Sequence, residues 1–440
     1  MKKMKYTITL VVGFVAIVAQ AQNTEHQIVV NTGVMFVSPN ETLSTHFDFS
    51  NTKEGSVVND GTVYFFRNFN NDGYFSFTQK GKNSTKGTTV FSRYNDEEGV
   101  QLISGNAMTE FFDVELNNKT PKMAFDLKNN MGVYGVLHFN EGIIKVDETL
   151  NPAHNLSYGM LTFHQGAQAF NTSDLSHAEG KVEKIGNESF EYPIGNQTYY
   201  RPASIGAPND ILDAVVAEYK LKDAAFFADR KGSTGVVKEV NTNEYWKLEG
   251  KLKKEETVIL SLTWDEQTTL PSLLKNPEEE LHIIRWDEKQ KLWVDEGGVV
   301  DMSTRTVTTP TKIKKFGYFT LGTVNKDWIL DDGVVIYNLV TPDGDGKNDY
   351  FIIDNINRYS NNRVEIYNRW GVKVFETTQY DPNGDGSSNV FTGYSDGKIT
   401  IDKKKKLPSG TYYYIVTYEY KDANGSRMIK KAANLHLETN

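Results

Sequence analysis

The feature that most constrains the fold is a succession of short apolar runs, each preceded by Asn, Asp and Gly. An Asn-Asp-Gly triplet at residues 59–61 precedes residues 62–66, and a second at 71–73, twelve residues on, precedes residues 74–77. Runs rich in β-branched and aromatic residues predict strands, and Asn, Asp and Gly favour tight turns. Helical periodicity is scarce, although residues 223–230 favour a turn or two of helix. The chain is therefore expected to be all-β.

Residues 22–178 continue this rhythm as far as the Asn- and Gly-rich segment at 129–142. Repeats of this length are typical of the rungs of a parallel β-solenoid, in which one rung is too small to bury its face alone. Asn-Gly turns also close hairpins, so a meander of antiparallel hairpins is the alternative. The spacing is irregular and leaves both arrangements open, with the solenoid-like one preferred.

Residues 179–325 predict a β-sandwich of Ig-like type. Strand-like runs recur at 244–248, 258–264 and 282–286, and each contains a tryptophan. Short strands at this spacing fit two packed antiparallel sheets. The tryptophans of these runs are expected to fill the core rather than to form a platform for a ligand.

Residues 1–21 have the pattern of a secretory signal peptide. Three lysines lie among the first five residues, residues 8–19 are apolar, and Ala19-Gln20-Ala21 has the small-x-small cleavage pattern. The apolar run is shorter than the roughly 20 residues that span a bilayer. The sequence therefore predicts export through the inner membrane.

Charge and cysteine content exclude several functions. The formal net charge is −9, whereas nucleic-acid binding needs a basic field, so no nucleic-acid partner is expected. The chain contains no cysteine, which excludes disulfides, a thiolate zinc site and a cysteine nucleophile.

Residues 326–333 predict a short polar linker, and a third unit is expected from 334 to 440. In this unit Pro342 fixes its own φ angle, and Gly344 and Gly346 let the chain double back. Strands joined by such turns predict a small β-sandwich.

A second block of this unit, residues 364–376, reads as a strand with alternating faces. Ile366, Asn368 and Trp370 are expected on one face. Tyr367, Arg369 and Gly371 are then expected on the other. Near the end of the chain, Pro408-Ser409-Gly410 is typical of a turn before an aromatic strand.

These blocks, in this order and at a chain terminus, resemble the gliding-motility-associated C-terminal domain. That domain is the type B sorting tail of type IX secretion cargo in Bacteroidota, and the resemblance covers residues 334–440. Asp343 stands where the family usually has asparagine, and the last strand, 433–437, lacks the usual glycine-aromatic start. The residues that match the sorting motif are Pro342, Gly344, Asp345, Gly346, Asn348, Asp349, Ile366, Tyr367, Asn368, Arg369, Trp370, Gly371, Gly410, Thr411 and Tyr412.

The resemblance implies a route and partners. Such cargo crosses the inner membrane by the general secretory route and then uses its folded tail as an address for the type IX translocon of the outer membrane. Its partners are outer-membrane proteins similar to the PorP/SprF family. The class includes large mobile adhesins, their accessory proteins and some enzymes.

Asp343, Asp345 and Asp349 form an acidic, glycine-punctuated loop. Calcium prefers oxygen ligands on such a loop, and the first part of an EF-hand loop has similar spacing. The glutamate expected later in an EF-hand loop is replaced by Asp354. Ca²⁺ is thus the one cofactor that the sequence suggests, and the alternative is that these residues only build turns.

No catalytic motif stands out: a nucleophile elbow, a zinc-binding His pair and a phosphate-binding loop are all missing. The chain is therefore expected to be a non-enzymatic cell-surface protein with a role in adhesion or as a gliding-motility accessory. Its partner would be a large surface adhesin, or lipopolysaccharide contacted by the basic run at 403–406. The alternative is a secreted polysaccharide-binding or polysaccharide-degrading protein.

Overall fold

A computed structural model describes residues 27–79, 86–94, 98–147, 150–151, 156–157, 159–233, 237–253, 257–313, 315–324, 334–395, 406–422 and 425–439. The predicted signal peptide, the predicted linker and most of the basic run at 403–406 lie outside these residues. Strands make up 51% of the chain and helices 4%, which confirms the all-β class. No helix of the described residues is long and apolar enough to cross a membrane. The chain divides into two compact units, Met1–Glu183 and Lys184–Asn440.

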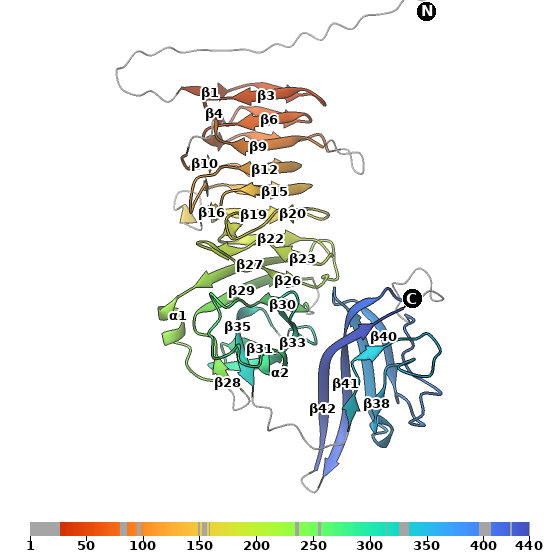
Figure 1. Cartoon of the computed structure of the whole chain (residues 1–440). Coiled ribbons are helices and arrows are strands. Elements are labelled where there is room, and N and C mark those ends of the chain that lie inside the picture. The colour runs from red at the N-terminus through yellow and green to blue at the C-terminus, as the bar shows by residue number, and fades with distance from the viewer. Residues whose placement is uncertain are drawn as a thin grey trace, which may run out of the picture. The chain divides into compact units, whose positions relative to one another are not determined.

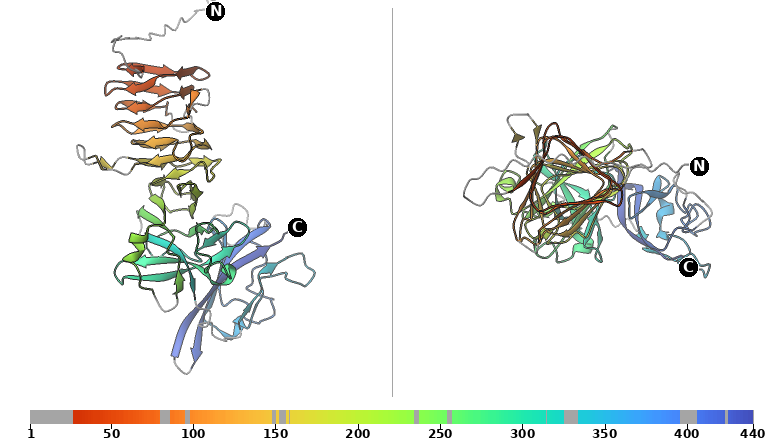
Figure 2. Two further views of the ribbon diagram at one scale, coloured as in Figure 1. Left: turned by 60° about the vertical axis from the view of Figure 1, so that its left-hand side comes forward. Right: turned by 90° about the horizontal axis from the view of Figure 1, so that it is seen from above.

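The first unit is a parallel β-solenoid of about 6 turns, and Figure 1 labels several of its strands, beginning with β1. Each turn contributes strands to three sheets, which outline a triangle in the view from above in Figure 2. The first sheet contains β1 (Ile28–Asn31), β4 (Asp48–Asn51), β7 (Phe69–Asn71), β10 (Gln101–Ser104), β13 (Phe125–Leu127), β16 (Ile144–Val146) and β21 (Ala178–Glu179).

The other two sides have the same parallel order. The second side is divided between two sheets. One contains β2 (Val34–Val37), β5 (Ser56–Asn59) and β8 (Tyr74–Ser76), and the next begins with β11 (Thr109–Phe111), β14 (Asn130–Val133) and β19 (Met160–Phe163). The third sheet contains β3 (Thr42–Thr45), β6 (Thr62–Phe65), β9 (Thr88–Ser92), β12 (Asp113–Asn117), β15 (Val136–Glu141) and β20 (Gln168–Phe170). A short hairpin pairs β17 (Leu150–Asn151) with β18 (Leu156–Ser157), and β22 (Val182–Ile185) follows.

The parallel pairing confirms the solenoid and excludes the meander. The repeat, however, is longer than the twelve-residue spacing of the turn signals. Ile28 pairs with Asp48, and Phe49 with Phe69, so one early turn takes 20 residues (48 − 28 and 69 − 49). The two Asn-Asp-Gly triplets lie at different corners of the triangle, after β5 and after β7. Their spacing covers the two sides formed by β6 and β7, not the three sides of a whole turn.

Asparagines stack inside the corner between the first two sheets. The Asn31 Nδ2 donates to Asn51 Oδ1 at 2.8 Å, and the Asn51 Nδ2 donates to Asn71 Oδ1 at 2.8 Å. The ladder continues through the Thr109 hydroxyl, which accepts from Asn71 at 2.9 Å and from Asn129 at 3.2 Å. Since an unpaired buried amide is costly, each rung stabilises the next. Residues that read as turn formers therefore also build the core.

Inside the triangle, phenylalanines stack from rung to rung. Phe69 is fully buried, and its ring centroid lies 4.8 Å from that of Phe65 and 5.4 Å from that of Phe75. Offset and edge-on ring pairs of this kind add to the burial of apolar surface. The solenoid core is thus a continuous column rather than a set of separate rungs.

The second unit begins with two antiparallel sheets. One contains β23 (Phe190–Tyr192), β26 (Ala203–Ile205), β30 (Leu260–Thr263), β34 (Thr306–Thr308) and β33 (Val299–Asp301). The other contains β27 (Ala214–Leu221), β29 (Glu244–Lys251), β35 (Gly317–Val324), β31 (Leu281–Asp287) and β32 (Leu292–Gly297), with β28 (Val237–Val240) beside β35. The hairpin of β24 (Gly195–Asn196) and β25 (Tyr199–Tyr200), and the short helix α2 (Pro277–Glu280), complete this region.

The core of this region confirms two expectations from the sequence. Trp246, Trp264 and Trp286 are all buried, as their place on strand-like runs predicts. The helix expected around residues 223–230 is α1 (Ala224–Ala228), whose first turn is capped by the Asp223 carboxylate accepting from the Phe226 amide at 2.9 Å.

The tail is a five-stranded sheet with a smaller two-stranded one. The larger sheet contains β37 (Leu339–Val340), β42 (Gly425–Leu437), β41 (Gly410–Asp422), β39 (Asn362–Asn368) and β40 (Lys373–Thr378). The smaller pairs β36 (Val335–Ile336) with β38 (Ile353–Asp354), and a 3₁₀ turn, η4 (Ile356–Arg358), follows. Tyr380 is fully buried in this core, and its hydroxyl bonds to the Phe351 carbonyl.

Candidate functional site

The first sorting block is an exposed loop tied together by its own carboxylates. The Asp349 carboxylate accepts from the amides of Gly344, at 2.6 Å, and Gly346, at 2.8 Å. Both glycines have left-handed φ angles, of 85° and 83°, as the sequence predicts for positions where the chain doubles back. Pro342 begins the loop, and Asn348 closes it by accepting from the Thr341 amide at 2.7 Å. The block is therefore a preformed surface shape.

This loop brings together the three carboxylates expected to hold Ca²⁺. Oxygens of Asp343, Asp345 and Asp349 all lie within 4.8 Å of one another, with the first two residues exposed. Asp354 is not part of this group, and its carboxylate accepts from the Tyr337 hydroxyl at 3.0 Å. The described residues thus offer three carboxylates in place of the fuller oxygen shell of an EF-hand, and calcium stays a prediction.

The calcium prediction has a direct test. A ligand that binds the folded tail but not the unfolded chain stabilises the tail by about 2.7 kcal/mol when its free concentration is 100 times its Kd. We expect calorimetry to show a higher Tm for the tail in Ca²⁺ than in EGTA, and Asp345→Asn to remove that difference. Asp385→Asn, at an exposed position of a separate loop with the sequence Asp-Pro-Asn-Gly-Asp-Gly at residues 381–386, is the control. A tail whose Tm is the same in Ca²⁺ and EGTA contradicts the prediction.

The second block differs from the expected strand. β39 ends at Asn368, so Trp370 does not continue its buried face but lies in a turn, 51% exposed. The Asn368 side chain accepts from the amides of Trp370 and Val372, both at 3.0 Å, and Gly371 has a φ of 71°. An Asn that bonds to backbone amides two and four residues on makes a turn in place of a strand.

This turn presents an aromatic and a cationic side chain together. The Arg369 guanidinium lies over the Trp370 ring, 4.8 Å from its centroid. Behind them Ile366 is fully buried in the tail core, and the Tyr367 hydroxyl donates to Glu365 at 3.0 Å. In this block the strand thus contributes Ile366 to the core, and the turn presents Arg369 and Trp370 to solvent.

The third block begins the long strand β41. Gly410 opens it, Thr411 follows, and Tyr412 is buried with its hydroxyl donating to the Pro408 carbonyl at 2.9 Å. In the register, Tyr412 pairs with Asn368, so the second and third blocks meet in one sheet. The first block lies in a separate loop before β38.

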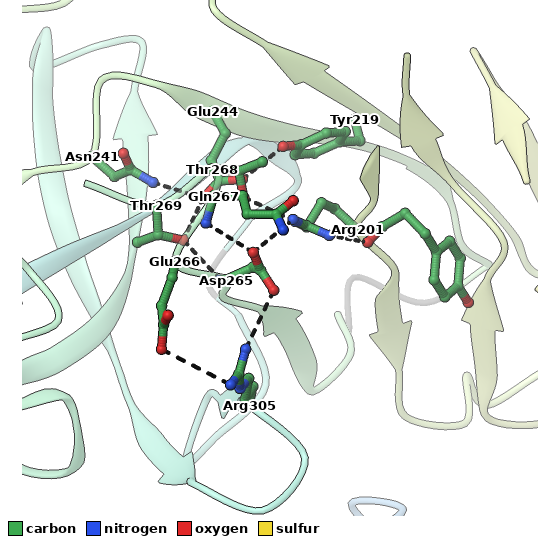
Figure 3. Close-up of polar contacts among 11 residues, drawn as sticks. Arg201, Tyr219, Asn241, Glu244, Asp265, Glu266, Gln267, Thr268, Thr269 and Arg305 are labelled. Atoms are coloured by element: carbon green, nitrogen blue, oxygen red, sulfur yellow. Dashed lines mark hydrogen bonds and ion pairs between the residues drawn. The ribbon is translucent and has the colours of Figure 1, made fainter. Parts of the chain in front are cut away.

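The sandwich contains a buried polar cluster that the sequence analysis did not find (Figure 3). Glu244 is completely buried at the start of β29 and accepts from Asn241 at 2.9 Å, from Thr269 at 2.7 Å and from the Tyr219 hydroxyl at 2.7 Å. Burial raises the pKa of Glu244, and hydrogen bonds from Thr269 and Tyr219 and the Arg201 charge only partly oppose it.

Arg201 joins this cluster to the loop after β30. Its Nε donates to Thr268 at 2.9 Å, and its Nη2 lies 3.0 Å from Asp265. Asp265 also lies 3.5 Å from the guanidinium of Arg305. Both oxygens of Glu244 have donors within the protein, so the cluster is arranged to hold the loop rather than to receive a substrate. Its partners are up to 67 residues apart, which is why no local motif indicates it.

The third sheet of the solenoid carries an outward-facing aromatic cluster, formed by His46, Tyr64, Phe66 and Tyr94. The His46 ring stacks on Phe66 with centroids 4.8 Å apart, and Tyr94 meets His46 edge-on at 4.3 Å. Tyr64 stacks on Phe66 at 5.9 Å. His46 and Tyr94 are exposed, with Tyr94 at 47%. The alternation of residues along β6 is enough to predict that Tyr64 faces outward. It does not predict the stacking of rings from neighbouring rungs.

Comparison with known proteins identifies only the tail. Residues 334–431 match the CHU_C type IX secretion signal domain. The chain thus ends in a C-terminal sorting tail of type IX secretion cargo, which implies interaction with the secretion machinery and export to the cell surface or the extracellular space. No curated protein and no solved structure matches the chain.

Proposed function

We propose that this chain is a non-enzymatic surface protein whose solenoid attaches the cell, or its gliding machinery, to a partner outside the outer membrane. The sorting tail supports the location. The aromatic cluster on the third sheet supports the attachment role, because stacked and exposed aromatic side chains are the kind of surface that binds partners.

The route that we propose begins with a signal peptide at residues 1–21 and inner-membrane export. A PorP/SprF-like protein of the outer membrane then binds the folded tail. The exposed side chains of Arg369 and Trp370 and the shape of the loop at residues 342–349 are the features that such a partner would contact. Aromatic and arginine side chains contribute most to interfaces of this kind.

For the passenger, the partner that we propose is a large surface adhesin or lipopolysaccharide. The net charge of −9 disfavours nucleic acid, because phosphate binding depends on a basic surface.

Attachment of cells tests this role. We expect cells that display the double variant Phe66→Ala and Tyr94→Ala to attach to surfaces, or to co-purify with the outer-membrane partner, at least several-fold less than wild-type cells. Phe170→Ala is the control, because that side chain is 46% exposed on the same sheet but outside the cluster. Equal attachment by the double variant and the wild type would contradict the proposed role.

A polysaccharide-binding role is the second candidate, and one observation favours it. A groove on the second side of the solenoid combines exposed apolar side chains with a fixed carboxylate.

A further inference from the structure

We propose that this groove, centred on Glu110, binds a neutral glycan. This inference gives the proposed attachment role a class of ligand. It rests on that role only in placing the groove at the cell surface. The groove has a volume of about 420 Å³ and lies where β8 and β11 face outward. Its lining includes Asp72, Gly73, Tyr74, Ala107, Met108 and Glu110.

Glu110 is held in one orientation by three side chains. Its Oε2 accepts from the Ser76 hydroxyl at 2.8 Å and from Gln79 at 3.3 Å, and its Oε1 accepts from the Tyr134 hydroxyl at 3.0 Å. Burial, the negative charge of Glu110 and this hydrogen bond raise the pKa of Tyr134 to about 12. Tyr134 therefore stays protonated and keeps donating at physiological pH. A carboxylate oxygen has more than one lone pair, so Glu110 can accept further hydrogen bonds from a ligand.

The apolar part of the groove is exposed and lies near a stack of aromatic rings. Tyr74 is 54% exposed and Met108 45% exposed. Tyr134 stacks on the His164 imidazole with centroids 3.9 Å apart, and Phe77 meets Tyr134 edge-on at 5.3 Å. The exposed Tyr74 and Met108 side chains therefore offer an apolar surface beside the Glu110 carboxylate.

A glycine lets Met108 pack closely beside the ring stack. Gly132 pairs with Glu110 in the register of β11 and β14. A Cβ added at Gly132 would lie 3.0 Å from the Met108 methyl and 3.2 Å from the His164 Nε2. A larger residue at this position would displace the Met108 side chain or the His164 ring, so the glycine helps to set the position of Met108 at the groove.

The chemistry of the groove fits a neutral sugar. A pyranose has an apolar C–H face, which can lie on Tyr74, and hydroxyls at its edge, which can donate to Glu110. Asp72 adds a second acceptor: partial burial raises its pKa, but hydrogen bonds from Asn70 and Asn106 outweigh this and lower the pKa overall. Among the described residues that line the groove, two carboxylates stand against one cation, Lys53, and this balance disfavours polyuronates and nucleic acids.

A peptide strand is less suited to this groove. β8 is hydrogen-bonded to β5 and β11 to β14, and these two strands end their sheets next to each other on the second side of the solenoid. A peptide would have to separate β8 from β11 in order to pair with either edge. The outward side chains of these strands remain available, and they provide the apolar surface and the acceptors described above.

Binding to purified full-length protein tests the inference. The probes are four soluble neutral polysaccharides (laminarin, xyloglucan, galactomannan and mannan) and the polyuronate alginate, measured by affinity electrophoresis and calorimetry. We expect at least one neutral polysaccharide to bind, alginate to bind at least tenfold more weakly, and Glu110→Gln and Tyr74→Ala each to weaken binding at least tenfold. Phe170→Ala, on the third sheet and outside both the groove and the aromatic cluster, should leave the affinity unchanged.

Three results would overturn the inference: no neutral polysaccharide binds, alginate binds more tightly than all of them, or Tyr74→Ala binds as the wild type does. Tyr74 is exposed, so its variant remains a fair test even where Glu110→Gln disturbs the fold. Protein that binds a glycan while cells fail to attach counts against the attachment role alone. Attachment without glycan binding counts against the inference alone.

Discussion

Replacing Glu244 with alanine is expected to destabilise the sandwich by about 3 kcal/mol or more, because three buried donors would lose their acceptor at about 1–3 kcal/mol each. These donors belong to Tyr219, Asn241 and Thr269. Four of the six tryptophans lie in the sandwich, so its unfolding in urea can be followed by tryptophan fluorescence. We expect a clearly lower urea midpoint for Glu244→Ala.

Glu244→Gln should behave differently and depend on pH. Glutamine has the same shape, and the Tyr219 hydroxyl can turn to accept from its amide. Burial raises the pKa of Glu244 above the ordinary value of 4.5, so the folded protein holds the proton more tightly than the unfolded chain does. Wild-type stability therefore falls as pH rises from about 4.5 to the raised pKa and stays reduced above it. Glutamine does not ionise, so the stability of Glu244→Gln does not fall with pH for this reason.

The urea midpoint of Glu244→Gln relative to the wild type should thus increase from pH 5 to pH 8. Glu249→Gln is the matched control, because Glu249 lies on the same strand but is exposed; it should change stability by less than about 0.5 kcal/mol at either pH. A Gln variant that loses stability relative to the wild type as pH rises would show that Glu244 is stabilised as an anion, against this account.

Replacing Phe69 with alanine is expected to cost the solenoid about 3–5 kcal/mol, the usual penalty for emptying a buried aromatic site. Phe69 is fully buried in the third turn and touches rings of its own and neighbouring rungs. A solenoid rung is stabilised mainly by its neighbours, and about three rungs are needed for a stable stack. Only β1 to β6, two turns, lie on the N-terminal side of the damage.

Hydrogen exchange should therefore show an unequal loss of protection. The amides of β1 to β6 should exchange much faster in Phe69→Ala, while those of β13 to β15 should change little. Phe170→Ala, at an exposed ring, is the control and should alter neither group. Equal loss of protection along the whole solenoid would mean that it unfolds as one unit, which contradicts a rung-by-rung account.

The sequence carries enough information to predict the class of fold and the place of many side chains. Strand-like alternation correctly predicts that Trp246 and Trp286 are buried, and the glycines at 344 and 346 correctly predict turns. These features are local, because each depends on the backbone preference or the period of a few residues. The choice between solenoid and meander was open because Asn-Gly corners serve both.

The features that the sequence alone did not reveal depend mostly on contacts between residues far apart in the chain. The ladder of Asn31, Asn51 and Asn71 needs the 20-residue turn, and the spacing of the turn signals obscured it. Trp370 leaves the strand because the Asn368 side chain bonds to backbone amides, which competes with strand pairing. The groups that donate hydrogen bonds to Glu110 and to Glu244 come from segments that only the fold brings together.

The most direct test of the central claim, that the tail at residues 334–440 directs the passenger to the cell surface, is protease treatment of intact cells. Cells carry either the full-length chain or the chain without residues 334–440, and a periplasmic protein reports on membrane integrity. We predict that external protease digests the full-length passenger and leaves the truncated chain protected. Digestion of the truncated chain at the same rate, or protection of both, would contradict the role of the tail as the export address.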